Sequence, residues 1–531
     1  MSTSCLPAAA RVAAFGLSAV LLGAPAAQAA GAPSANVAWQ AAAADADIER
    51  AFTRAKAEKK PVLLYWGATW CPPCNQLKAT LFNRQEFAAL SKNFVAVHVD
   101  GDRPGAQKLG TRFKVSGYPT TVLFTPEGQE ITRLPGEVDA PQALATLQLG
   151  LSGGRAAKAV LADALAGKAL TANEWRLLAF YSWETDEQQL VPKAELPGTL
   201  VKLAAASPGG LNGEGETTTR LWLKALAASD DGKGLKADDA LRQRVNKVLA
   251  DAREVRTQMD VLTGGAADIV RTLEDDESPR RVPLVAAYDA ALKRLEADAT
   301  LSRGDRMGAL IARIDLARLK VPKEDAHPKL AEPLLADARE HVARADREIT
   351  DGYERQAVIT AAAYALGRAG LWADSEALLK SNLAKSHSAY YLMSQLGSNA
   401  RKQGKKDEAL RWYGEAFEKS RGPATRLQWG SGYLTALIDL APQDPARIEK
   451  VAAQLLREAA GDAGAFEGRS VRSLQRAGNK LVGWNGEGKH AAVMKRLQTQ
   501  LDGLCAKTGP DDRVACEKLL KPATATAAKP A

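Results

Sequence analysis

Histidine and cysteine are both scarce in this chain, with five of each among 531 residues. The cysteines are Cys5, Cys71, Cys74, Cys505 and Cys516. A structural zinc site needs four ligands, which usually come from two Cys-x-x-Cys motifs or from nearby histidines. The chain has one such motif, at Cys71 and Cys74, and His98 is the one histidine close to it in sequence. The sequence therefore disfavours a metal site there.

A dense run of basic residues is also missing. The 71 Lys and Arg residues are spread among 62 Asp and Glu residues, and the formal net charge is +9. Nucleic-acid-binding proteins typically gather their positive charge in one patch or stripe. Because neither a basic run nor aromatic residues interleaved with basic ones occur here, we expect no nucleic-acid partner.

The chain lacks an apolar run long enough to span a bilayer comfortably. The best candidate, Val12–Ala24, follows Arg11 and falls short of the ~20 residues that a span needs. It precedes Ala27-Gln28-Ala29, a small-x-small pattern typical of signal cleavage. We therefore expect residues 1–29 to be a signal peptide and the mature protein to be exported, without stable membrane insertion. The periplasm is the expected location, with secretion as an alternative; an uncleaved anchor is the other interpretation of the run.

Residues 36–151 alternate between strand and helix patterns. The run PVLLYWG at 61–67 is typical of a strand that is buried on both faces. NFVAVHVD at 93–100 predicts the next strand, and residues 118–136 predict two strands joined by a Pro-Glu-Gly turn. With helical spacing before, between and after these strands, the pattern predicts a compact α/β sandwich with a mixed sheet.

Strand patterns disappear in residues 155–520, which are rich in Ala, Leu, Arg and Glu with helical periodicity. Gly370 and Gly404 are 34 residues apart, which is the period of tetratricopeptide repeats, and residues 356–423 resemble that family in part. We expect a large all-α domain, with an α-solenoid favoured over an irregular helical domain. Residues 521–531 contain no core-forming side chains and predict a disordered tail.

The setting of Cys71 and Cys74 bears on whether they form a metal clip, a permanent disulfide or a redox pair. A disulfide across so small a loop would stabilise little through chain entropy. Pro72 and Pro73 fit the first turn of a helix, which places Cys71 at its N-terminus, where N–H groups and the helix dipole favour the thiolate. Cys74, one turn further in, would be less ionised and placed to resolve a mixed disulfide. The pattern favours a redox pair.

Residues 61–147 resemble the thioredoxin-like family, with Trp-Cys-Pro-Pro-Cys as the active-site motif. The resemblance implies a thioredoxin-like fold and a thiol–disulfide oxidoreductase that needs no cofactor. It implies Cys71 as the nucleophile and Cys74 as the resolving cysteine of a redox-active disulfide. The partners that it implies are protein clients with thiols or disulfides and an upstream redox donor.

A second hallmark of that family is the Tyr118-Pro119 pair. The resemblance implies that Pro119 is cis, faces the active-site disulfide and leaves the backbone of Tyr118 free to pair with an extended substrate, with Trp70 at the rim. One departure concerns Tyr65, which stands where many thioredoxins carry a buried Asp that helps to deprotonate the resolving cysteine. Because tyrosine is neutral near pH 7, the chain lacks that base.

Other polar residues give weaker indications. We expect His98 to be a packed strand histidine, and Asp100 and Asp102 to lie in a solvated turn rather than to bind a cation. Cys505 and Cys516 flank a short loop between two helical segments, and in an oxidising compartment we expect a structural disulfide between them.

The sequence thus predicts an exported oxidoreductase, with reduction or isomerisation weakly favoured. The alternative is a protein-binding scaffold in which the thioredoxin-like part is a docking module without turnover. The direction of electron flow depends on the reduction potential, which the sequence does not give.

Overall fold

The computed structural model describes residues 37–136, 139–186, 189–210, 215–229 and 234–521. The expected signal peptide lies outside the described residues, as does nearly all of the expected tail. Residues Ala35–Ala531 form one compact unit, so the α/β region and the helical region are described together. No helix in the described part of the chain has both the length and the apolar character that a membrane span requires.

The α/β region contains a five-stranded mixed sheet in the order β1-β3-β2-β4-β5. Strands β1, β3 and β2 are parallel, whereas β4 runs antiparallel to β2 and to β5. The elements are β1 (Gln40–Ala42), α1 (Asp45–Glu58), β2 (Val62–Gly67), α2 (Pro72–Leu77), the π-helical turn η1 (Lys78–Phe82), α3 (Gln85–Leu90), the 3-10 turn η2 (Ser91–Asn93), β3 (Val95–Asp100), α4 (Ala106–Arg112), β4 (Thr120–Phe124), β5 (Glu130–Leu134) and α5 (Ala140–Leu151). The expected α/β class is confirmed, and β1 and α4 are additions that the sequence pattern did not predict.

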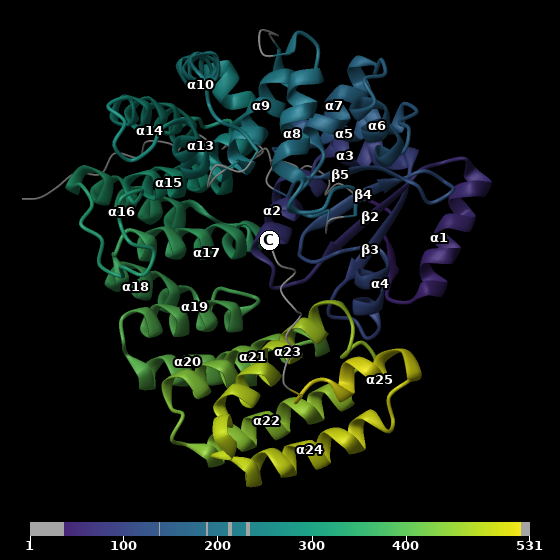
Figure 1. Cartoon of the computed structure of the whole chain (residues 1–531), viewed down its shortest axis with the longest axis vertical. Helices are drawn as coiled ribbons and strands as arrows, with labels where there is room; N and C mark the ends of the chain where they lie inside the picture. The colour runs from purple at the N-terminus through teal and green to yellow at the C-terminus, as the bar shows by residue number, and fades with distance from the viewer. Residues whose placement is uncertain (1–36, 137–138, 187–188, 211–214, 230–233, 522–531) are drawn as a thin grey trace, which may run out of the picture. The chain divides into compact units, whose positions relative to one another are not determined.

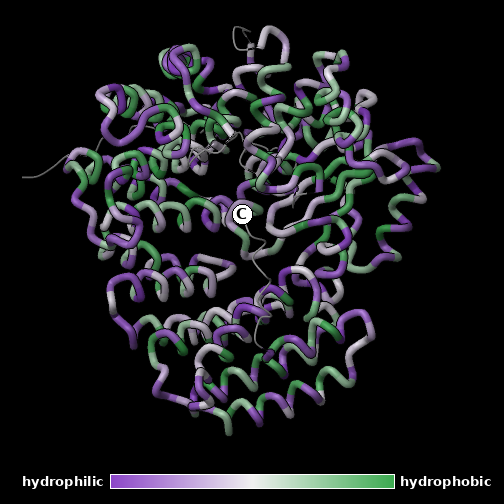
Figure 2. The backbone as a smooth tube through the Cα atoms, in the orientation of Figure 1, coloured by the Kyte–Doolittle hydropathy of each residue, from purple (hydrophilic) through white to green (hydrophobic). Residues whose placement is uncertain are grey.

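All six residues of β2 are buried, so this central strand is covered on both faces of the sheet. Val62, Leu64 and Trp66 face a core that they share with α1 and α4. Leu63 and Tyr65 face the other core, which contains both active-site cysteines and continues into the helical region. Figure 2 shows the strands of the sheet as largely hydrophobic, whereas the helices alternate between hydrophobic and hydrophilic residues.

In the region after α5, the described residues form helices joined by turns and loops, with no strand among them, which confirms the expected all-α class. Its helices are α6 (Ala157–Leu165), α7 (Ala172–Phe180), α8 (Leu196–Ala206), α9 (Glu216–Ala228), α10 (Asp239–Ala250), α11 (Ala252–Thr257), α12 (Met259–Gly264), α13 (Ala266–Leu273), α14 (Arg281–Ala297), α15 (Arg303–Ala317), α16 (Glu332–Glu348), α17 (Gly352–Arg368), α18 (Trp372–Asn382), α19 (Ala389–Lys402), α20 (Lys406–Lys419), α21 (Pro423–Leu440), α22 (Pro445–Ala460), α23 (Gly468–Trp484), the 3-10 turn η5 (Gly486–Gly488), α24 (Ala491–Cys505) and α25 (Pro510–Glu517).

Helix pairs recur in this region, and Figure 1 shows α17 to α20 following one another as neighbours. Gly370 and Gly404, which follow α17 and α19, both have a positive φ that glycine adopts without steric cost. Near the C-terminus, a disulfide joins Cys505 to Cys516 and so links α24 to α25. Helix α17 packs directly against α2, which brings the helical region to the active-site cysteines.

Candidate functional site

The cysteine pair lies where β2 leads into α2. Cys71 caps α2, with Pro72 and Pro73 in the first turn, and its Sγ accepts a hydrogen bond from the backbone N–H of Cys74 at 3.2 Å. The two sulfurs are 2.10 Å apart in a disulfide. A sulfur that accepts an N–H bond at a helix N-terminus is stabilised as a thiolate once the disulfide is reduced. The geometry therefore provides an activated sulfur at Cys71 and a more interior one at Cys74.

The loop before β4 contains the Tyr118–Pro119 pair. The Tyr118–Pro119 peptide bond is cis, and Pro119 is buried. The Tyr118 hydroxyl accepts a hydrogen bond from Gln107 Nε2 at 2.9 Å, which holds the ring in place. Among the described residues, neither the N–H nor the C=O of Tyr118 has a backbone partner. Tyr118 therefore lies outside the hydrogen-bonded part of β4 as described.

Trp70 is held by both regions of the chain. Its indole Nε1 donates to Thr425 Oγ1 at 2.6 Å and to Asp102 Oδ2 at 3.1 Å. The ring stacks on Tyr391, with a centroid separation of 5.8 Å, and packs against Trp429 at 5.5 Å. The residue that precedes the nucleophile is thus fixed from helices α19 and α21.

Arg469 at the start of α23 completes this arrangement. Its guanidinium lies over the rings of Trp70, at 4.6 Å, and Tyr118, at 4.9 Å. We call Tyr391, Thr425, Trp429 and Arg469 the helical cover. The cover thus contacts Trp70 and Tyr118, and of the nearby cysteines Cys71 is 2% exposed and Cys74 is fully buried.

Asp102 connects the cover to the loop after β3. Its Oδ1 accepts hydrogen bonds from the Thr425 N–H at 2.9 Å and hydroxyl at 2.6 Å. Burial raises the pKa of Asp102 to about 6, and the nearby Asp100 adds to the rise, whereas the bonds from Thr425 oppose it. The expectation of a solvated turn was wrong for Asp102, because α21 packs over it.

Tyr65 and His98 form an apolar setting rather than a proton relay. Their rings stack at 4.9 Å, and the Tyr65 hydroxyl is buried without a hydrogen-bond partner in the described residues. Burial raises the pKa of Tyr65 and lowers the pKa of His98 to about 4, so both side chains are neutral near pH 7. Neither supplies the negative charge that a buried aspartate would.

Two cavities flank the first turn of α2, and both are lined by Pro73 and Gly136. The Pro119 pocket, of about 550 Å³, is also lined by Tyr118, Pro119, Leu200, Ala228, Val261 and Gly264. The Pro72 pocket, of about 340 Å³, is also lined by Pro72, Gln76, Gly308, Ile311, Ala361 and Tyr391. In each, one wall comes from the α/β region and the other from the helical region.

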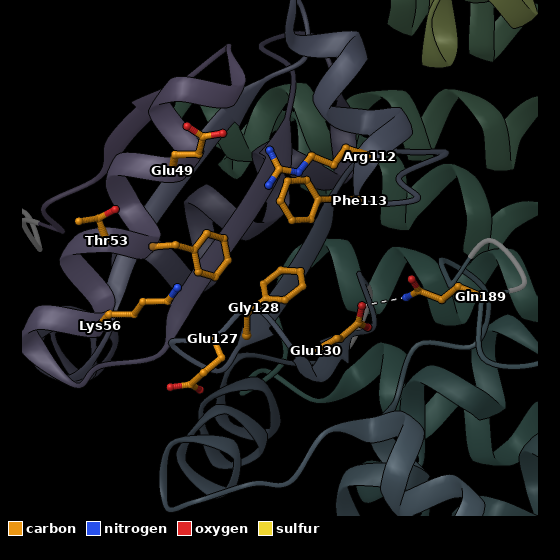
Figure 3. Close-up of a pocket in the computed structure, with 11 residues that line it drawn as sticks. Glu49, Thr53, Lys56, Arg112, Phe113, Glu127, Gly128, Glu130 and Gln189 are labelled. Atoms are coloured by element: carbon orange, nitrogen blue, oxygen red, sulfur yellow. Dashed lines mark hydrogen bonds between the residues drawn. The ribbon is translucent and has the colours of Figure 1, made fainter.

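A third cavity, of about 710 Å³, lies apart from the cysteines. It is bordered by α1, the end of α4 and the β4–β5 hairpin, where Glu49, Lys56, Arg112 and Glu130 bring charges of both signs (Figure 3). Its lining includes no cysteine, so we do not assign it to the redox site.

The structure brings Trp70, Cys71, Cys74, Tyr118 and Pro119 together. The cover could not be predicted from the sequence, because Thr425, Trp429 and Arg469 lie more than 300 residues from the motif and have ordinary helical surroundings.

We expect that Thr425→Val will raise the alkylation rate of Cys71 about tenfold in the reduced, folded protein. The change keeps the side-chain shape but removes the hydroxyl that bridges Trp70 and Asp102, and losing a hydrogen bond to a buried charge costs about 1.5–3 kcal/mol. Thr435→Val on the same helix is the matched control, because that hydroxyl is buried without a partner. Equal rates in the two variants would show that the cover does not limit access.

Comparison with known proteins gives consistent matches to the α/β region. Residues 48–150 match the model of a thioredoxin-like domain. A thioredoxin-like protein of Synechocystis is 34% identical over 90 residues, which are 17% of this chain and 81% of that protein. The thiol:disulfide interchange protein DsbD 2 of Pseudomonas aeruginosa is 33% identical over 119 residues, 22% of this chain and 20% of that protein.

DsbD of Yersinia pestis is 34% identical over 98 residues, which are 18% of this chain and 16% of that protein. The chain therefore spans about a fifth or less of the length of these interchange proteins. The residues that match the family model, 48–150, include both cysteines of the pair.

Proposed function

The chain belongs to the thioredoxin-like family, and on that premise we propose that it is an exported thiol–disulfide oxidoreductase acting on protein clients. The observation that carries the proposal is the placement of Cys71 as the cap of α2, with Cys74 one turn further in and the cis Pro119 loop beside them. Relatives named as thiol:disulfide interchange proteins share this region. We propose the periplasm as the location.

The proposed reaction transfers two electrons from the reduced pair to a client disulfide. The Cys71 thiolate attacks one client sulfur, a mixed disulfide forms, and the other client sulfur leaves as a thiolate that takes up a proton. Deprotonated Cys74 then attacks the Cys71 sulfur, which releases the second client thiol and forms the Cys71–Cys74 disulfide. An upstream dithiol donor restores the reduced pair. Isomerisation uses the first step and its reversal on a different client sulfur.

The neutral side chain at position 65 bears on the second step. Tyr65 occupies the position of the missing acid and is neutral, while Glu86 lies exposed on α3 and pairs with Arg84. We propose that resolution by Cys74 is slower than the first attack, so that mixed disulfides persist long enough for isomerisation.

A scaffold function is the second candidate, and the burial of Cys71 favours it. The two functions differ in redox behaviour. We expect the folded protein to exchange Cys71–Cys74 with a glutathione buffer, whereas Cys505–Cys516 stays oxidised. Alkylation followed by mass spectrometry of each peptide measures both pairs. If Cys71–Cys74 stays oxidised in the buffer until the chain unfolds, the scaffold function is favoured. If the pair exchanges, its midpoint reduction potential gives the direction of electron flow.

A further inference from the structure

The Pro119 pocket joins the redox site to the helical region. Tyr118 and Pro119 form one side, and helices α8, α9, α12 and α13 form the opposite side. Its volume of about 550 Å³ lies within the range that buries most of a small ligand or several side chains. Small residues on the helical side, including Ala227, Ala228 and Gly264, leave this space open.

The chemistry of the pocket favours an extended polypeptide. Within the described residues the N–H and C=O of Tyr118 have no backbone partner, and main-chain pairing at such an edge is a recurring mode of peptide binding. Leu196, Leu200 and Val261 offer an apolar surface to the side chains of such a strand. A strand placed there runs beside Pro73, two residues after the nucleophile.

Charge in the pocket restricts the segment further. Three carboxylates line it, on Glu184, Asp260 and Asp268, against the single ammonium group of Lys224. Lys224 donates to the carbonyl of Tyr181 at 2.8 Å, and Asp260 pairs with Arg220 outside the pocket. Asp268 likewise pairs with Arg271, so guanidinium groups offset two of the three carboxylates. A client carboxylate would therefore meet a lining whose one ammonium group is already hydrogen-bonded, whereas an apolar side chain would meet Leu200 and Val261.

We propose that the helical region supplies half of the client site: the Pro119 pocket receives an extended client segment and takes a large apolar side chain next to the client cysteine. This inference rests on the proposed function and adds the class of client to it. It assigns selectivity to helices α8, α9, α12 and α13, which lie outside residues 48–150, the part of the chain that matches the thioredoxin-like family model.

Gly264 and Gly308 offer a matched test in the full chain. Each lies in a helix without positive φ, and a Cβ added at either would meet no atom within 4 Å. Gly264 lines the Pro119 pocket and Gly308 lines the Pro72 pocket. A phenylalanine at either position also has a higher helix propensity than glycine, so both variants should fold.

The substrates are short peptides whose cysteine carries a thionitrobenzoate mixed disulfide, with Phe, Ala or Glu beside the cysteine. Dithiobis(nitrobenzoate) is the small disulfide without a peptide. For the reduced parent protein we expect kcat/KM to fall in the order Phe, Ala, Glu, with about a tenfold span. Gly264→Phe should lower the rate on the Phe peptide at least about fivefold and leave the small disulfide within about twofold. Gly308→Phe should leave both rates within about twofold.

Equal rates for the Phe and Glu peptides, or equal losses from the two variants, would overturn the inference and leave the oxidoreductase function standing. Failure of the parent protein to react with the small disulfide as well as with every peptide would overturn both. A Phe-peptide rate lowered by Gly308→Phe alone would place the client in the Pro72 pocket and would also overturn the inference.

Discussion

Cys71→Ser will abolish disulfide exchange, lowering the rate by more than about a thousandfold, whereas Cys74→Ser will retain the first attack and accumulate mixed disulfides with clients. The reason is positional, since Cys71 caps α2 and its sulfur accepts the Cys74 N–H, while Cys74 lies fully buried behind it. Release of a chromogenic thiol measures exchange, and non-reducing electrophoresis shows the trapped species.

A control for this experiment comes from the other pair. The double variant Cys505→Ser/Cys516→Ser removes the disulfide between α24 and α25 and should keep full exchange at a temperature where it is folded. Equal amounts of mixed disulfide with Cys71→Ser and Cys74→Ser would contradict the assignment of roles, because the first attack is assigned to the Cys71 sulfur alone.

Asp102→Asn will remove a pH dependence of stability that the parent protein carries. Burial under α21 raises the folded-state pKa of Asp102 from 3.8 to about 6. A carboxyl with a raised pKa favours the folded state fully below pH 3.8, and this contribution is lost as pH rises through about 6. A shift of about two units corresponds to about 2–3 kcal/mol.

We compare the free energies of unfolding of Asp102→Asn and the parent. The value for the variant minus the value for the parent should rise by about 2–3 kcal/mol between pH 3.8 and a pH above 6. Urea unfolding of both proteins across this range measures it, and the subtraction cancels the other titrating groups. Parallel curves would show that Asp102 is not held beneath the cover in solution.

Most of the α/β region follows from local pattern. The unbroken apolar run of β2 requires burial on both faces, and Pro72 and Pro73 fit only the first turn of the next helix. The short strand β1 escaped notice because three residues carry too little periodicity, and it forms through pairing with β3. Helix α4 also escaped prediction. It begins after Gly105, where a turn with positive φ marks its start instead of an amphipathic sequence pattern.

The sequence by itself determined the fold class, the cysteine pair and the Tyr118–Pro119 hallmark, because each depends on residues close together in the chain. Only the tertiary structure decided that Thr425, Trp429 and Arg469 cover Trp70 and that helices wall the Pro119 pocket. The contacts of the cover join residues more than 300 positions apart, and the walls of the pocket come from α2, the Pro119 loop and helices α8, α9, α12 and α13. A threonine or arginine on a helix has the same local pattern whether it faces water or an active site, and only packing of the helices against the sheet distinguishes the two.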